Sequence, residues 1–223
     1  MTGSQEDFMG AHCCHHDNHE QLPDPQAEAR QRRVLWTALV INAAMFVVEV
    51  GAGLAAGSVS LQADALDFLA DAGNYAVSLA VVGMVLRRRA TAALLKGATM
   101  GAFGLWVAGA TIWHALAGTV PEPITMGAVG IAALAVNSAV LAMLWAFRTR
   151  DANMRSVWLC SRNDVAGNFA VMLAAAGVFG TGTGWPDVIV AAVMSGLALW
   201  GAAQVIRQAA DELRASRQAA VVA

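Results

Sequence analysis

Two short runs of polar residues interrupt otherwise apolar stretches of the sequence. Asp67 and Asp71 are four residues apart, and Asp64 lies three residues before Asp67. On a helix, side chains three or four residues apart share a face, so these carboxylates would point to one place. The sequence repeats the arrangement with Cys160 and Asp164. Carboxylates and a thiolate from two facing helices could close a four-ligand tetrahedral metal site, the geometry that zinc favours.

The N-terminal segment contains a second group of potential metal ligands. Four of the five histidines and two thiols fall within eight residues, at His12, Cys13, Cys14, His15, His16 and His19. Tracts rich in cysteine and histidine bind soft and borderline divalent metals. The alternative is a flexible polar tail in which the cluster is accidental.

Other polar residues in the apolar stretches have simpler interpretations. Asn42 and Glu49 are seven residues apart and share a helical face, where we expect hydrogen bonds to neighbouring helices, or else a position along a pathway. Asp64 could be an entrance residue or an acceptor in helix packing. Arg162 could pair with one of the carboxylates. We interpret His114 as an interfacial residue and leave it out of the site.

The composition indicates that these residues lie in a membrane. Hydrophobic residues make up 57% of the 223 residues, charged residues only 13%, and the mean hydropathy is +0.53. Crossing a hydrocarbon core of about 30 Å takes about 20 mostly apolar residues. Six stretches qualify, at 34–56, 61–86, 97–118, 123–147, 155–179 and 186–206. The sequence therefore predicts an all-α integral membrane protein, a compact bundle of six transmembrane helices.

The basic residues predict the orientation of this bundle. Thirteen of the fourteen flank alternate connections of the predicted spans: Arg30, Arg32, Arg33, Arg87, Arg88, Arg89, Lys96, Arg148, Arg150, Arg155, Arg207, Arg214 and Arg217. Cytoplasmic loops carry an excess of Lys and Arg, so both termini are predicted to be cytoplasmic. The first 33 residues contain no apolar run long enough for a secretory signal. We therefore expect a cytoplasmic tail at 1–33, a membrane domain at 34–207 and a short cytoplasmic tail at 208–223.

Several classes of function fit this sequence poorly. A formal net charge of −2 gives no reason to expect a nucleic-acid partner. Three cysteines cannot form a disulfide framework, which fits a reduced compartment and metal ligation. An enzyme that used Cys160 as its nucleophile would need a nearby base, and no intramembrane histidine accompanies it. We therefore expect neither an enzyme nor a prosthetic group.

Taken together, these motifs resemble the cation diffusion facilitator family over approximately residues 34–213. The strongest similarities are Ser58-Val59-Ser60-Leu61 leading into Ala63-Asp64-Ala65, followed by the pair Asp67 and Asp71. A second similar segment runs from Ser156 through Cys160 and Asp164 to Gly167. Further similarities are Pro121-Glu122-Pro123, Val136-Asn137 and Trp185-Pro186-Asp187.

The resemblance implies a six-span exporter that exchanges zinc or a related metal for protons by alternating access. Its transport site would comprise Asp67, Asp71, Cys160 and Asp164, with a cysteine at 160 where the family usually has a histidine. Because a thiolate is a soft ligand, zinc, cadmium or cobalt is the expected ion, and magnesium and calcium are not.

The resemblance also sets expectations for location and assembly. We expect a multi-pass protein of the cell inner (cytoplasmic) membrane, with the metal ion, protons and the lipid bilayer as its partners. The family's usual cytoplasmic domain after the sixth span has no counterpart in this sequence, so a homodimer would depend on the membrane helices. The competing hypothesis is a membrane-embedded protein that binds or senses metal without transporting it.

Overall fold

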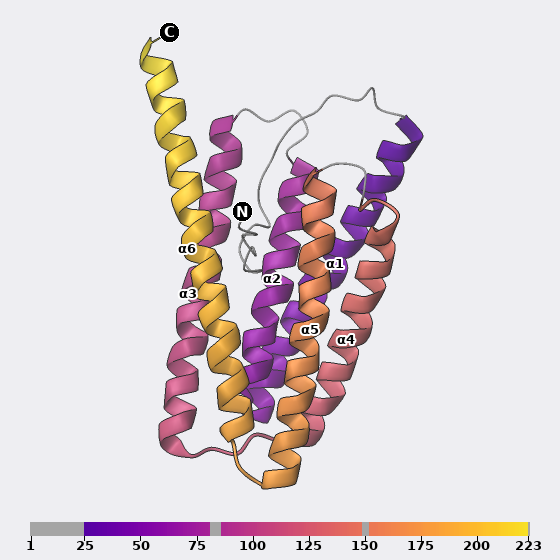
Figure 1. Cartoon of the computed structure of the whole chain (residues 1–223), viewed down its shortest axis with the longest axis vertical. Helices are drawn as coiled ribbons and strands as arrows, with labels where there is room; N and C mark the ends of the chain where they lie inside the picture. The colour runs from indigo at the N-terminus through magenta and orange to yellow at the C-terminus, as the bar shows by residue number, and fades with distance from the viewer. Residues whose placement is uncertain (1–24, 81–85, 149–151, 223) are drawn as a thin grey trace, which may run out of the picture.

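The computed structural model describes residues 25–80, 86–148 and 152–222, without the side chains of 25, 27, 86–89, 152–157, 159, 160 and 216–222. This part of the chain forms six helices: α1 (Pro25–Ala56), α2 (Val59–Ala80), α3 (Leu86–Ala117), α4 (Pro123–Trp145), α5 (Ala152–Thr181) and α6 (Trp185–Val222). The start of α1 and the end of α6 lie at one end of the bundle, called here the terminal end (Figure 1). The predicted all-α bundle of six helices is confirmed.

Five of the six helices are long and apolar enough to cross a membrane, as judged on the described residues: α1, α3, α4, α5 and α6. The exception is α2, which carries three aspartates in 22 residues. It packs against α1, α3, α5 and α6, and most of its first half is buried. The polar side chains of α2 therefore face protein rather than lipid, as intramembrane ionisable residues generally do.

The surface of the bundle is apolar and part of its interior is polar. Large hydrophobic side chains are strongly exposed, up to 83% for Leu116, while Asn42, Glu49 and Asn137 are almost completely buried. An extensive exposed apolar surface marks a surface that contacts membrane. The arrangement matches a bundle whose solvent is the hydrocarbon of a bilayer.

Three helices extend by nine residues or more beyond the spans that apolar composition predicts. α1 begins at Pro25, α3 begins at Leu86, and α6 continues to Val222. The additional turns carry arginines of the predicted basic clusters. Apolar length measures the hydrocarbon crossing alone, whereas these helices continue past it into the polar region.

Three similar turns join the helices at the opposite end of the bundle, called here the turn end. Gly57, Gly118 and Gly182 follow α1, α3 and α5, and their φ angles are 65°, 66° and 65°. A left-handed residue after the last turn is a common way to end a helix, and glycine adopts it without steric cost. Each turn is short, so the helices that it joins lie antiparallel.

Candidate metal site between α2 and α5

A carboxylate from α6 fixes the N-terminus of α2. Ser58 Oγ donates to Asp187 Oδ1 at 2.7 Å, and the backbone N–H groups of Val59 and Ser60 donate to the same carboxylate at 2.9 and 3.0 Å. The first N–H groups of a helix lack partners within it and carry partial positive charge, so a carboxylate there is stabilising. These bonds set the height and rotation of α2, and therefore the places of its carboxylates.

Two hydroxyl groups hold Asp71. Tyr75 Oη donates to Asp71 Oδ2 at 2.7 Å, and Ser161 Oγ donates to the same oxygen at 3.3 Å. The two hydroxyls are 3.0 Å apart, and all three side chains are buried. Tyr75 comes from one turn further along α2 and Ser161 from α5. The bonds therefore orient Asp71 toward α5.

Asp164 of α5 faces Asp71 across the interface. The two carboxyl groups lie within hydrogen-bonding reach of each other, and Asp164 Oδ2 is buried with no partner among the described residues. Asn168 Nδ2 donates to the backbone oxygen of Asp164 at 2.8 Å. Two ionised carboxylates repel at this separation, and the charge of Lys96 from α3 offsets part of this repulsion at Asp71. A shared proton or a bound cation would offset the rest.

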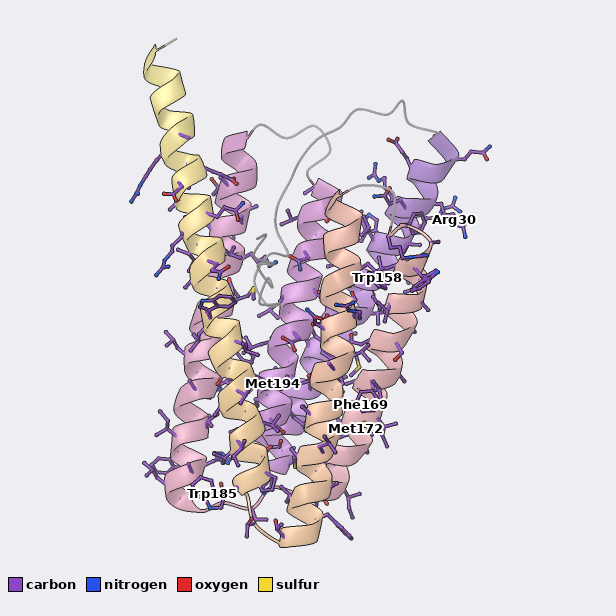
Figure 2. All side chains as sticks on the ribbon, in the orientation of Figure 1. Arg30, Trp158, Phe169, Met172, Trp185 and Met194 are labelled. Atoms are coloured by element: carbon purple, nitrogen blue, oxygen red, sulfur yellow. The ribbon has the colours of Figure 1, made fainter. Side chains whose placement is uncertain are left out.

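Asp67 lies against the backbone of α5. A Cβ atom built on Gly167 would be 3.3 Å from Asp67 Oδ2 and 3.7 Å from Asp64 Oδ1. Met194 of α6 approaches the same point, with Cε at 3.4 Å (Figure 2). Gly167 is three residues beyond Asp164, so its lack of a side chain provides the room in which the α2 carboxylates meet α5.

The structure therefore places Asp67, Asp71 and Asp164 at one interface, between α2 and α5. Cys160 belongs to α5 one turn before Asp164, but its side chain is outside the described residues. No group of three His, Cys, Asp or Glu side chains among the described residues is arranged to hold a metal ion. The candidate N-terminal cluster, His12 to His19, lies outside the described part of the chain.

Sequence reasoning missed several residues that support this interface. Tyr75 is the only tyrosine and stands four residues after Asp71, a spacing that would have suggested the contact. Ser161 adjoins Cys160, and Asn168 follows Asp164 by four residues. No local spacing relates Asp187 to α2, because 127 or more residues separate it from the groups that it binds.

Arg162 and Asn163 lie on the exposed side of α5. The guanidinium carbon of Arg162 is 5.7 Å from the centre of the Trp158 ring, near the terminal end of the bundle (Figure 2). A cation over an aromatic face is stabilised by the ring quadrupole. Arg162 thus lies beside an aromatic ring on the outer surface of α5.

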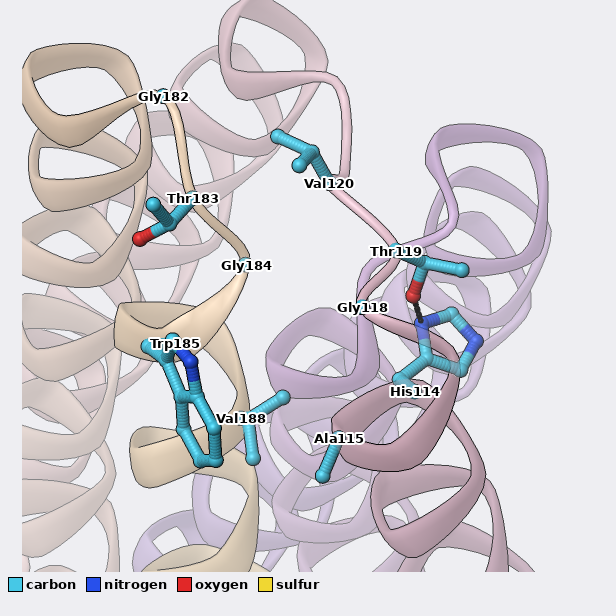
Figure 3. A pocket seen from close by; sticks show the side chains of 10 residues that line it. All are labelled: His114, Ala115, Gly118, Thr119, Val120, Gly182, Thr183, Gly184, Trp185 and Val188. Atoms are coloured by element: carbon cyan, nitrogen blue, oxygen red, sulfur yellow. Dashed lines mark hydrogen bonds between the residues drawn. The ribbon is translucent and has the colours of Figure 1, made fainter.

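His114 lies at the turn end, in a hollow of about 320 Å³ between the α3–α4 and α5–α6 turns (Figure 3). Its Nδ1 atom is 2.8 Å from Thr119 Oγ1. The hollow is also lined by Val120, Trp185 and Val188, which offer no metal ligand. These surroundings, at the turn end and away from the α2 carboxylates, are compatible with the interpretation of His114 as an interfacial residue.

A family model described as the cation efflux transmembrane domain matches residues 35–214. The match covers all six helices except the first turns of α1 and the end of α6.

Proposed function

Since the chain belongs to the cation efflux transmembrane family, and is thus a multi-pass membrane transporter of metal cations rather than an enzyme, we propose that it exports zinc, cadmium or cobalt in exchange for protons. Asp67, Asp71, Cys160 and Asp164 are the proposed ligands of the transported ion. The metal is the substrate in this proposal, and no prosthetic group takes part.

One observation carries the proposal more than any other. Asp71 is buried and Asp164 is half-buried with its Oδ2 atom fully covered, and these two carboxyl groups from different helices face each other within hydrogen-bonding reach. Moving an uncompensated charge into low dielectric costs several kcal/mol. Lys96 of α3 is the basic side chain that acts on Asp71, and it brings a single positive charge to two carboxyl groups. A divalent cation between α2 and α5 would remove this cost.

The composition of the proposed ligand set favours borderline metals. Three carboxylates and one thiolate give an oxygen-rich site with one soft donor. Zinc is commonly four-coordinate with such ligands, whereas magnesium and calcium prefer oxygen alone. Zinc, cadmium and cobalt therefore remain the proposed substrates.

Proton exchange follows from the chemistry of the same ligands. Carboxylates and thiols must lose their protons to bind a metal, so protons and metal compete for one set of side chains. In alternating access, the helices would expose the site first to the cytoplasm and then to the outside. Protons arriving from the outside would then displace the ion outward.

Metal uptake into inside-out vesicles tests this function. Vesicles that contain the purified protein should accumulate zinc, cadmium or cobalt when a proton gradient is imposed. Asp71→Asn and Asp164→Asn should each abolish uptake, because asparagine has nearly the shape of aspartate but lacks the negative charge that would bind the metal. Asp211→Asn is the control, since Asp211 has an exposed side chain. Full uptake by either site variant would refute the site, and metal binding without any uptake would favour the binding or sensing alternative.

The N-terminal cluster and the assembly belong to the same proposal. A cytoplasmic tail carrying His12 to His19 would concentrate metal on the side from which an exporter loads. The protein would act in the inner membrane, and a homodimer would pair through the membrane helices.

A further inference from the structure

Glu49 and Asp64 form a second pair of buried acidic side chains. Glu49 comes from α1 and is fully buried at 0% exposure, and Asp64 comes from α2 and is 1% exposed. All four carboxyl oxygens are buried with no hydrogen-bond partner among the described residues. Glu49 therefore forms none of the expected hydrogen bonds to neighbouring helices within that part of the chain.

The packing of α1 against α2 brings these two side chains face to face. Met45 and Phe68 share one apolar cluster, and Ala52 packs against the cluster that contains Leu61. Since the helices are antiparallel, this register puts residue 49 level with residue 64. The two carboxyl groups lie close enough to hydrogen-bond if one of them is protonated.

Glu49 and Asp64 differ from Asp187, which is a carboxylate with a structural role. Asp187 is also only 1% exposed, but it accepts three hydrogen bonds from the start of α2. Asp71 likewise accepts bonds from two hydroxyls. Glu49 and Asp64 have no such donors in the described residues. Only a proton shared between them or a bound cation would therefore offset the cost of burying them, which is several kcal/mol for each ion.

The pair is continuous with the carboxylates of the candidate metal site. Asp64 and Asp67 both approach Gly167, and the three aspartates of α2 extend over about 10 Å of helix at 1.5 Å per residue. Asp64 is the one nearest the turn end, because α2 begins at Val59. In the proposed orientation, the turn end faces outward.

We propose that Glu49 and Asp64 form a second binding station for a divalent cation, between the Asp67–Asp71–Asp164 site and the outer surface. The ion would exchange the thiolate-containing site for two carboxylates from α1 and α2 before it leaves. The direction of this movement rests on the proposed function, whereas binding at the station does not.

The proposal is tested by counting bound ions. The purified full-length chain, in detergent, is dialysed to equilibrium against saturating Co²⁺, and the bound metal per chain is measured. Glu49→Gln and Asp64→Asn should each bind one Co²⁺ fewer than the wild type, whereas Asp211→Asn should bind as many. Comparison with the wild type cancels whatever the tail at His12 to His19 binds. An unchanged count in both station variants would overturn the proposal.

Two further measurements keep the outcome decisive. The amide variants should retain the thermal stability of the wild type, because each provides an N–H donor to a carboxylate that lacks one. Asp71→Asn separates the station from the transport site. If only Asp71→Asn lowers the count, the station is refuted and the proposed function stands; if only the station variants lower it, the transport site is refuted.

Discussion

At the scale of single residues, the buried carboxylates differ in what surrounds them. Asp187, in α6, accepts three hydrogen bonds from the start of α2, as expected of a carboxylate with a structural role. Asp71 accepts hydrogen bonds from two hydroxyl groups and also faces Asp164. Glu49 and Asp64 accept no hydrogen bond from the other described residues. A cation is needed most where donors are fewest, so the balance of donors distinguishes groups that hold the fold from groups that bind an ion.

The space at Gly167 gives a prediction for a single methyl group. Gly167→Ala would place Cβ 3.3 Å from Asp67 Oδ2, so the carboxylate must shift by a few tenths of an ångström. We expect the KM for metal in the vesicle assay to rise about three- to tenfold, corresponding to about 0.7–1.4 kcal/mol. The fold should persist, because alanine is favoured over glycine within a helix.

Gly196→Ala is the matched control for this prediction. A Cβ atom at Gly196, in α6, meets nothing within 4 Å. Its KM should equal that of the wild type. Equal KM values for the two variants would show that Asp67 does not need its place beside α5.

At the scale of helices, the attachment of α2 to α6 predicts a loss of stability. Asp187→Ala would leave three buried donors of Ser58, Val59 and Ser60 without their acceptor. Each unsatisfied buried donor costs roughly 1–3 kcal/mol. We expect a decrease of several degrees in Tm in detergent, since each kcal/mol shifts Tm by about 2–4 °C in a chain of this size. Asp187→Asn should fall between alanine and the wild type, and a Tm unchanged in both variants would contradict the capping role.

A second helix start, that of α4, predicts a dependence on pH. Glu122 accepts backbone bonds from Ile124 at 3.0 Å and Thr125 at 2.6 Å. Hydrogen bonds from the Thr125 side chain and backbone, and then from the Ile124 backbone, lower the pKa of Glu122 below its usual value. Capping by the carboxylate is therefore fully present above the ordinary pKa of about 4.3 and is lost as pH falls through the lowered value.

Glu122→Gln tests this sign. The wild type should have the higher Tm at pH 6, and its advantage over the variant should shrink as the pH falls from about 5 to 3, because glutamine does not titrate. Thermal unfolding followed by circular dichroism across this range provides the measurement. A difference that stays constant with pH would argue against a capping role for the ionised carboxylate.

The helices follow from local sequence, but their mutual contacts do not. Apolar length predicted six helices, and the i, i+4 spacing of Asp67 and Asp71 predicted their shared face. The approach of Asp187 to α2, and that of Glu49 to Asp64, depend on packing between segments distant in sequence. Spacing within one helix fixes a face, while only the register of two helices decides which residues meet across it.

At the scale of the whole molecule, the polar residues form a line along α2. Tyr75, Asp71, Asp67, Asp64 and Ser60 follow one another from the terminal end toward the turn end, and most of them are buried. The surrounding helices present apolar side chains outward. A polar line within an apolar exterior is the arrangement expected of an ion route across a bilayer.

The direction of this route depends on the orientation of the bundle, which is the last prediction. Basic residues gather at the terminal end, so that end should be cytoplasmic and the turn end should face outward. A membrane-impermeant maleimide should therefore label Thr183→Cys, at the exposed α5–α6 turn, in intact cells. Ala215→Cys, on the exposed surface of α6 near the terminal end, should be labelled in inside-out vesicles instead. The wild type gives the background from the three native cysteines. The opposite labelling would put Glu49 and Asp64 on the cytoplasmic side, where the same pair would load the ion rather than release it.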